Sequence, residues 1–137
     1  MRTLSSKRRC MRNRRGVAAV EFSICLPVLA LLLIGSIEFA NAIFLRQAIT
    51  LAAYEASQIA TGIGGTETAA KTRGQEVLAG YDIVDGEITV TPSITADTAP
   101  LTEVTVTVSV PANSNSVGIN RFLDGKNIQK SVTMSRL

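Results

Sequence analysis

The side chain best placed for chemistry is Glu21, a lone carboxylate near the start of a long apolar run. It follows the segment 14–17 (Arg-Arg-Gly-Val), and sixteen residues without a charge, 22–37, come after it. Within a membrane, an acidic side chain costs about 2.5–3.5 kcal/mol on insertion scales, so it has a functional partner by default. Two interpretations are open. Either Glu21 reaches the cytoplasmic head groups, or it pairs with a charge from a neighbouring chain.

The second interpretation requires cleavage of the chain after Gly16. Val17 would then carry a new α-amino group, and Glu21 would be the fifth residue of the mature chain. Inside an apolar bundle of such helices, each carboxylate and each amine is costly alone, so pairing between neighbours would neutralise both and fix their register. A glycine before the cut suits a protease that needs close backbone approach. Gly16 and Val17 are therefore the predicted processing residues.

Other kinds of chemistry find little support in the sequence. There is no histidine, so the common catalytic triads are absent, and the two cysteines, Cys10 and Cys25, lack a metal-binding spacing. No glycine-rich phosphate loop follows a strand. The carboxylates beyond the apolar run are scattered, mostly near turns, and we interpret them as solvated surface groups. We therefore expect no enzyme activity, no metal and no cofactor.

The basic residues are concentrated at the N-terminus. Residues 1–16 hold seven Lys and Arg and no acid, whereas residues 17–137 hold seven basic and eleven acidic residues. A nucleic-acid-binding face needs a basic stripe across the folded part of the chain, so nucleic acid is not an expected partner. The arm instead fits the positive flank on the cytoplasmic side of a membrane segment, where it also contacts anionic lipid head groups.

Residues 17–45 are the predicted transmembrane helix. The stretch 17–37 gives twenty-one residues if Glu21 is tolerated, close to the twenty or so that cross a bilayer. Pro27 lies inside this stretch and removes one backbone donor. It is predicted to kink or locally open the helix.

Two residues at the far end of the span are candidate interface positions. Gly35, with its small neighbours Ser36 and Ala40, offers a surface for close helix packing, although ordinary membrane-helix composition explains these residues at least as well. Glu38 has two interpretations. It anchors the helix at the outer interface, which we favour, or it pairs with Arg46 or a neighbouring subunit.

The helix is expected to continue beyond the membrane to about Thr61, before a run of glycines ends it. Apolar residues recur there every three or four positions, which predicts one buried stripe: Leu45, Ile49, Ala52, Ala56, Ile59 and Ile63. Thr66 is the predicted N-cap of a second helix. One side of that helix is expected to hold Ala70, Gly74, Val77, Leu78 and Tyr81.

The remaining residues alternate between apolar and polar, which predicts strands. The clearest strand has valines at alternate positions from 104 to 110, between threonines and a serine. Shorter patterns predict a strand around Ile88 and Val90, where Pro92 indicates an edge strand or a bulge, and a last strand at 128–137. An apolar island in the loop before that strand is interpreted as a loop or short helix on the core: Val117, Ile119, Phe122 and Leu123.

The N-terminal arrangement resembles the processing site of type IV prepilins: a basic leader, a glycine, an apolar helix and a glutamate at the fifth mature position. More closely, the chain is similar to TadE-like pseudopilins, the minor pilins of the Tad pilus. The similarity is carried by residues 15–22 (Arg-Gly-Val-Ala-Ala-Val-Glu-Phe), by Leu26-Pro27 and by residues 35–40 (Gly-Ser-Ile-Glu-Phe-Ala). It is strong over about residues 14–60, and the rest matches in pattern only.

This resemblance implies cleavage after Gly16 by an inner-membrane prepilin peptidase. It implies that Glu21 and Phe22 act in recognition and assembly, with other pilins or pseudopilins and with the inner-membrane assembly platform. The implied role is structural, in starting, capping or supporting pilus assembly. Adhesion is an additional role that the resemblance leaves open.

We therefore predict an α+β, pilin-like fold in which a long N-terminal helix packs on a small antiparallel sheet. The predicted parts are a basic leader (1–16), a transmembrane helix (17–45) and an extracytoplasmic α+β domain (46–137). The chain would cross the bacterial inner membrane once, with its N-terminus in the cytoplasm, and entry into a pilus stays open. The rival hypothesis is an uncleaved single-pass protein whose extracytoplasmic domain binds a ligand or partner.

Overall fold

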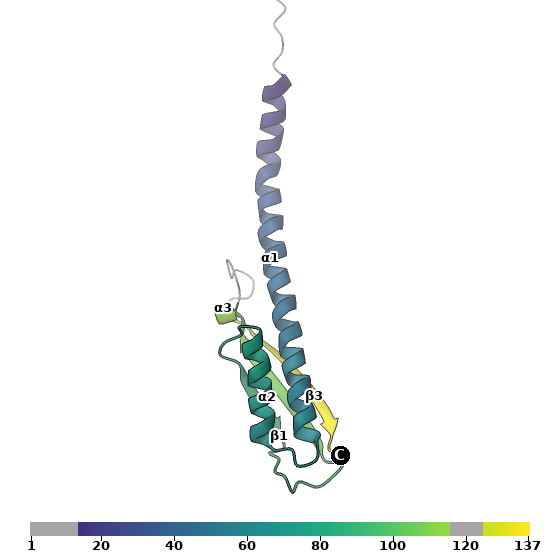
Figure 1. The fold of residues 1–137 in the computed structure, drawn as a ribbon. Coiled ribbons are helices and arrows are strands. Elements are labelled where there is room, and N and C mark those ends of the chain that lie inside the picture. Colours follow the sequence, from purple (N-terminus) through teal and green to yellow (C-terminus); the bar gives the residue numbers. More distant parts are fainter. Residues whose placement is uncertain (1–13, 116–124) are drawn as a thin grey trace, which may run out of the picture. The chain divides into compact units, whose positions relative to one another are not determined.

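A computed structural model describes residues 14–115 and 125–137 of the chain (Figure 1). It contains α1 (Arg14–Thr61), α2 (Glu67–Gly80), β1 (Glu87–Thr91), β2 (Glu103–Pro111), α3 (Ala112–Asn115) and β3 (Asn127–Ser135). The chain divides into an N-terminal unit, residues 1–35, and a C-terminal unit, residues 36–137. A long helix with a small antiparallel sheet confirms the predicted α+β class.

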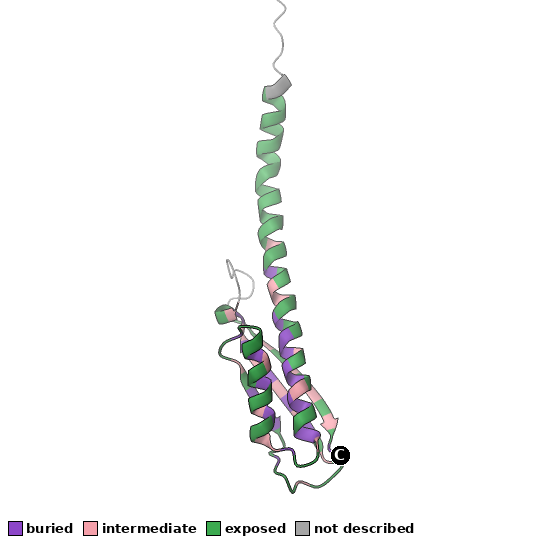
Figure 2. Ribbon diagram, viewed as in Figure 1, coloured by how far each residue is buried: buried purple, intermediate pink, exposed green. Residues whose placement is uncertain are grey.

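The N-terminal unit contains the first half of α1, and its side chains are exposed almost throughout (Figure 2). Its large apolar residues from Val17 to Ile34 are between 41% and 70% exposed. By length and composition, the helix 16–61 is apolar enough to cross a membrane, with a mean hydropathy of 2.5 in its most apolar window. The helix continues on both sides of Pro27, which lies inside it. It begins at Arg14, three residues before the predicted start, because arginine favours helix and a single glycine costs only about 1 kcal/mol.

In the C-terminal unit, the second half of α1 buries one face. Leu45, Ile49, Ala52 and Ala56 are buried as predicted. The prediction was wrong for the last two positions of the stripe, since Ile59 is exposed and Ile63 is 93% exposed. Ile63 lies beyond the end of α1 at Thr61, where helical spacing no longer applies.

The buried face of α1 turns toward α2 near its C-terminal end, which explains why Ile59 is exposed. Ala53 and Ala60, on the adjoining side, are buried in its place. Gly74 of α2 marks the close contact, because a methyl group there would lie 3.4 Å from the Cβ of Ala56. A simple stripe assumes one packing partner, and α1 has two.

The sheet has the order β1-β2-β3, with both pairs antiparallel. The four valines of β2 at alternate positions from 104 to 110 are fully buried, which confirms the strand predicted from their alternation. The opposite face of the sheet is polar, and hydroxyl pairs join β2 to β3: Thr105 to Thr133 and Thr107 to Ser131, each at 2.8 Å between oxygens. Such cross-strand pairs help to fix the register of neighbouring strands.

The second helix begins as predicted. The backbone N–H of Ala69 donates to the hydroxyl of Thr66 over 3.2 Å, so Thr66 is the N-cap. Ala70, Gly74 and Leu78 are buried against the core. Tyr81, the C-cap of α2, is exposed and packs edge-on against the ring of Phe44, with 5.7 Å between centroids.

The C-terminal end is held by Arg136, which is 3% exposed. Its guanidinium donates to the carbonyl of Gly65 over 3.2 Å and to that of Ala96 over 3.0 Å. Next to it, the N–H of Leu137 donates to the carbonyl of Thr61 over 3.0 Å. The last strand is thereby joined to the turn between α1 and α2.

The short helix α3 was not predicted from the sequence. Its last residue, Asn115, bonds both backbone groups of Val84: it accepts from the N–H over 2.7 Å and donates to the carbonyl over 2.8 Å. The apolar island predicted at 117–123 lies outside the described residues, as does most of the predicted leader.

The turn after α1 leaves no room for a side chain at Gly65, and a substitution there tests this. A methyl group there would overlap the carbonyl oxygen of Ile59 and lie 2.9 Å from that of Ala60, and these backbone atoms have little freedom to move. We expect Gly65→Ala to lower the free energy of unfolding by about 2 kcal/mol. Gly80→Ala is the control, because beyond the backbone of its own helix the added methyl meets no atom within 4 Å. Urea unfolding of the two variants in detergent makes the comparison, and equal midpoints would contradict the prediction.

Candidate functional site

The predicted processing residues lie in the first turn of α1. Beyond the backbone of the helix itself, no atom lies within 4 Å of the place where a Cβ on Gly16 would stand, and Val17 is exposed. The bond between them is therefore approachable but helical. Because glycine is a poor helix former, Gly16 lowers the cost of opening this turn by about 1 kcal/mol relative to alanine.

Glu21 lies on the exposed surface of the apolar half of α1. Its carboxylate makes no hydrogen bond or ion pair with any residue in the described part of the chain. It is also the one charged side chain between positions 16 and 37. By helical spacing it shares a face with Val17, Ile24 and Val28, which are all exposed. The structure therefore presents a single negative charge on a helix surface that is otherwise apolar.

The other predicted residues of this helix are distributed along it rather than brought to one site. Phe22 is exposed one position after Glu21, and Pro27 follows within the same helix. A Cβ added to Gly35 would meet no atom within 4 Å beyond the backbone of its own helix. The surface at Gly35 is therefore open to a second chain, and close packing there stays a prediction.

Glu38 lies in the C-terminal unit and is only 6% exposed, so its surroundings are protein. The alternative pairing with Arg46 is absent, since the Arg46 guanidinium makes no ion pair with the described residues. Nothing in the local sequence distinguishes this carboxylate from an interfacial one, which is why its burial was not foreseen.

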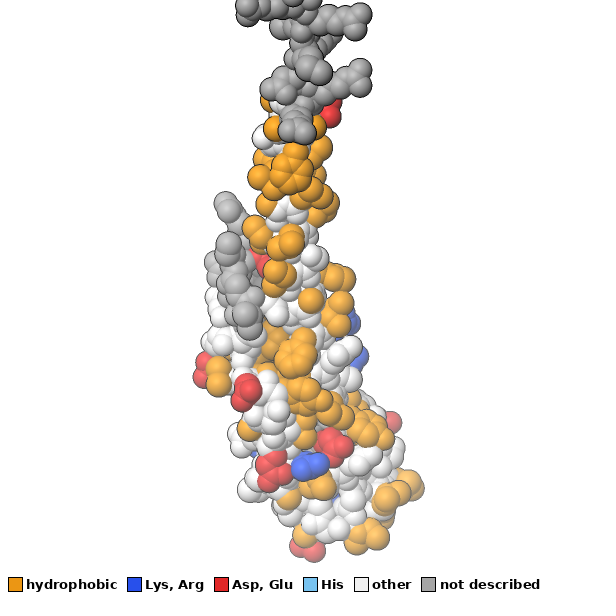
Figure 3. Space-filling view, turned by 45° about the horizontal axis from the view of Figure 1, so that its top comes forward, with side chains coloured by type: hydrophobic (Ala, Val, Ile, Leu, Met, Phe, Trp, Pro, Cys, Tyr) orange, Lys and Arg blue, Asp and Glu red, His pale blue; other side chains and the backbone are white. Residues whose placement is uncertain are grey.

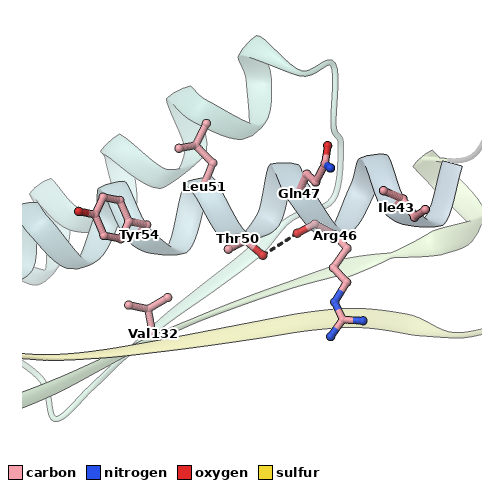
Figure 4. Close-up of a pocket in the computed structure, with 7 residues that line it drawn as sticks. All are labelled: Ile43, Arg46, Gln47, Thr50, Leu51, Tyr54 and Val132. Carbon is pink, nitrogen blue, oxygen red and sulfur yellow. Dashed lines mark hydrogen bonds between the residues drawn. The ribbon is translucent and has the colours of Figure 1, made fainter. Parts of the chain in front are cut away.

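A groove that the sequence analysis missed runs along the exposed face of α1 beside β3 (Figure 4). Its volume is about 490 Å³, and its lining comes mostly from one side of α1: Ile43, Arg46, Gln47, Thr50, Leu51, Tyr54 and Val132. Seen along the helix, these positions recur at spacings of three and four. That pattern is a second stripe, and it was hidden because polar residues interrupt it.

Three carboxylates of the C-terminal unit form exposed ion pairs. Lys71 binds Glu67 over 2.7 Å, and Arg73 bridges Glu55 and Glu76 over 3.2 Å each. The hydrogen bond from Lys71, with another from Ser93, lowers the pKa of Glu67. Hydrogen bonds to Glu55 and then to Glu76 raise the pKa of Arg73. These groups stabilise the surface of α2, and no cluster able to hold a metal ion occurs among the described residues.

Comparison with known proteins finds a family for the N-terminal part of the chain. The family model of TadE-like proteins matches residues 16–58. The match begins at the predicted processing glycine and extends along α1 almost to its end. Searches of curated proteins and of solved structures gave no match.

Proposed function

We propose that this chain, which is a TadE-like protein over residues 16–58, is a minor pilin that is cleaved after Gly16 and acts in Tad pilus assembly. The family supports a Tad pilus-related, minor pilin-like protein. To this family-level statement we add three proposals: the cleavage after Gly16, the role of Glu21 and the part played in assembly.

The observation that carries the proposal is the surface of the first half of α1. Its large apolar side chains are exposed on all sides, and one carboxylate near its start has no partner in the described chain. An apolar surface of this extent is stable in water only when a membrane or another protein covers it. A lone charge within it requires an opposite charge from the same surroundings.

These requirements suggest where the protein works. The apolar half of α1 would cross the inner membrane, with the basic leader on the cytoplasmic side and the α+β domain outside. A prepilin peptidase would remove the leader, and other pilins or pseudopilins and the assembly platform would then cover the helix. The proposed role is structural rather than catalytic, because the polar groups of the C-terminal unit act in caps, turns and surface ion pairs.

The N-terminal residue of the protein from its native membrane tests this proposal. We expect a mature chain that begins at Val17. Gly16→Leu should lower the processed fraction by at least about tenfold, because its side chain obstructs close backbone approach. Gly35→Leu is the matched control, since it adds the same side chain to the same helix away from the cut.

A chain that keeps residues 2–16 in cells with an active peptidase would overturn the proposal. The better account would then be an uncleaved single-pass protein whose outer domain binds a partner. Equal processing of the Gly16→Leu and Gly35→Leu variants would place the cut elsewhere.

A further inference from the structure

The groove beside β3 exposes apolar side chains, and most of its lining lies beyond the predicted transmembrane helix, residues 17–45. Ile43, Leu51 and Tyr54 are between 39% and 45% exposed. Tyr54 lies nine residues beyond position 45, the end of the predicted transmembrane helix, which is about 14 Å along the helix axis. Figure 3 shows hydrophobic side chains gathered along α1 in this unit. A protein surface is therefore the suitable cover.

One end of the groove is positively charged. Arg46 lies in its lining, and Lys130 shares the face of β3 with Val132, two residues away. The bond from Leu137 to Thr61 places the end of β3 beside the end of α1, so Lys130 lies toward Arg46. Neither cation makes an ion pair with the described residues, and no acid lines the groove.

The chain itself carries a surface that complements this groove. The stripe of Val17, Glu21, Ile24 and Val28 is apolar, with one negative charge. It spans twelve residues, as do the groove positions 43–54, so each is about 17 Å from its first to its last residue. Glu21 lies four residues into its stripe, and Arg46 three residues into the groove.

We propose that the groove binds the stripe 17–28 of a second copy of this chain, with Glu21 against Arg46 and Lys130. A parallel arrangement places the opposite charges together, whereas an antiparallel one would place Glu21 beside Thr50. The two copies would be offset by about 25 residues, or roughly 38 Å. The inference rests on the proposed function, because cleavage before Val17 frees the start of the stripe. The Glu21 carboxylate has two oxygens. It can therefore accept hydrogen bonds from the guanidinium of Arg46 and from the α-amino group of a neighbouring copy at the same time.

Disulfide cross-linking tests this arrangement, because the same offset places Cys25 of one copy beside Thr50 of the other. In a full-length chain carrying Cys10→Ser, we expect Thr50→Cys to form a disulfide-linked dimer with the native Cys25 in the pilus-bearing cell. Such a bond needs Cα atoms within about 7 Å. Ala79→Cys, exposed on α2, is the control, and the Cys25-only chain gives the background. A dimer yield equal to either control would overturn the proposal.

The charge pairing is tested in the same cross-linking strain. Arg46→Glu should lower the dimer yield by about tenfold, and Arg46→Lys should retain most of it. Equal yields for the Glu and Lys variants, or a cross-link to a different protein instead of a second copy, would overturn the proposal.

The mass of each product separates the two proposals. A dimer of chains that begin at Val17 supports both. A mature chain without the dimer overturns the docking alone, and a chain that keeps its leader overturns the proposed function and the docking with it.

Discussion

Replacing Arg136 by methionine is expected to lower the free energy of unfolding of the C-terminal unit by about 3 kcal/mol. The guanidinium is buried and donates to the carbonyls of Gly65 and Ala96. Methionine retains much of the volume of the side chain but donates nothing, so both carbonyls lose a charged donor in a place that water reaches poorly. Each such bond contributes roughly 1.5 kcal/mol or more.

The matched control is Arg73→Met, because Arg73 makes ion pairs instead of buried bonds to carbonyls. Its two carboxylate partners lie at the surface, where salt and water screen the interaction. Its effect on stability should therefore be much smaller. Urea unfolding of full-length protein in detergent compares the two variants. A loss of stability for Arg73→Met as large as that for Arg136→Met would mean that Arg136 does not hold the C-terminus as inferred.

Arg136 also shows where the sequence could not predict the structure. A terminal Ser-Arg-Leu carries no periodic signal, and arginine is almost never buried without partners. Its partners come from two turns, near residues 65 and 96, and these lie far from it in the sequence. Only the assembled fold brings them together.

The elements with a strong local period were predicted well. The valines of β2 alternate without interruption, so the strand and its buried face follow from the sequence alone. The first half of α1 was likewise predicted from the sequence, because an apolar run of that length is typical of a helix that crosses a membrane. The prediction of a buried stripe was wrong at Ile59. Burial at that position depends on which elements α1 packs against and not on the spacing of apolar residues along the helix.

The groove was missed for a related reason. Its lining includes Arg46, Gln47 and Thr50, which a pattern search counts as polar and therefore as a solvated face. In the fold, the aliphatic parts of long polar side chains lie among Ile43, Leu51 and Tyr54. Sequence patterns assign one character to a residue, whereas a surface is built from its separate atoms.

Glu21→Gln is expected to separate processing from assembly. The variant keeps the shape of the side chain at position 21 and leaves Gly16 unchanged, so most chains should still begin at Val17. It loses the negative charge, however, and the amount of protein recovered with other pilus subunits should fall by about tenfold or more. A neutral amide leaves the opposite charge on the partner without compensation in apolar surroundings, which is the costly outcome.

Glu55→Gln is the control for this change, since it makes the same substitution in the C-terminal unit. There the lost charge affects one surface ion pair with Arg73, and assembly should be retained. Mass spectrometry of the N-terminus and co-purification from one culture measure both properties together. If Glu21→Gln were processed and recovered with its partners as fully as Glu55→Gln, the carboxylate would be an interfacial group that reaches the lipid head groups. A helix that tolerated its loss would assemble through apolar contacts alone, and the charge could not then fix the register between copies.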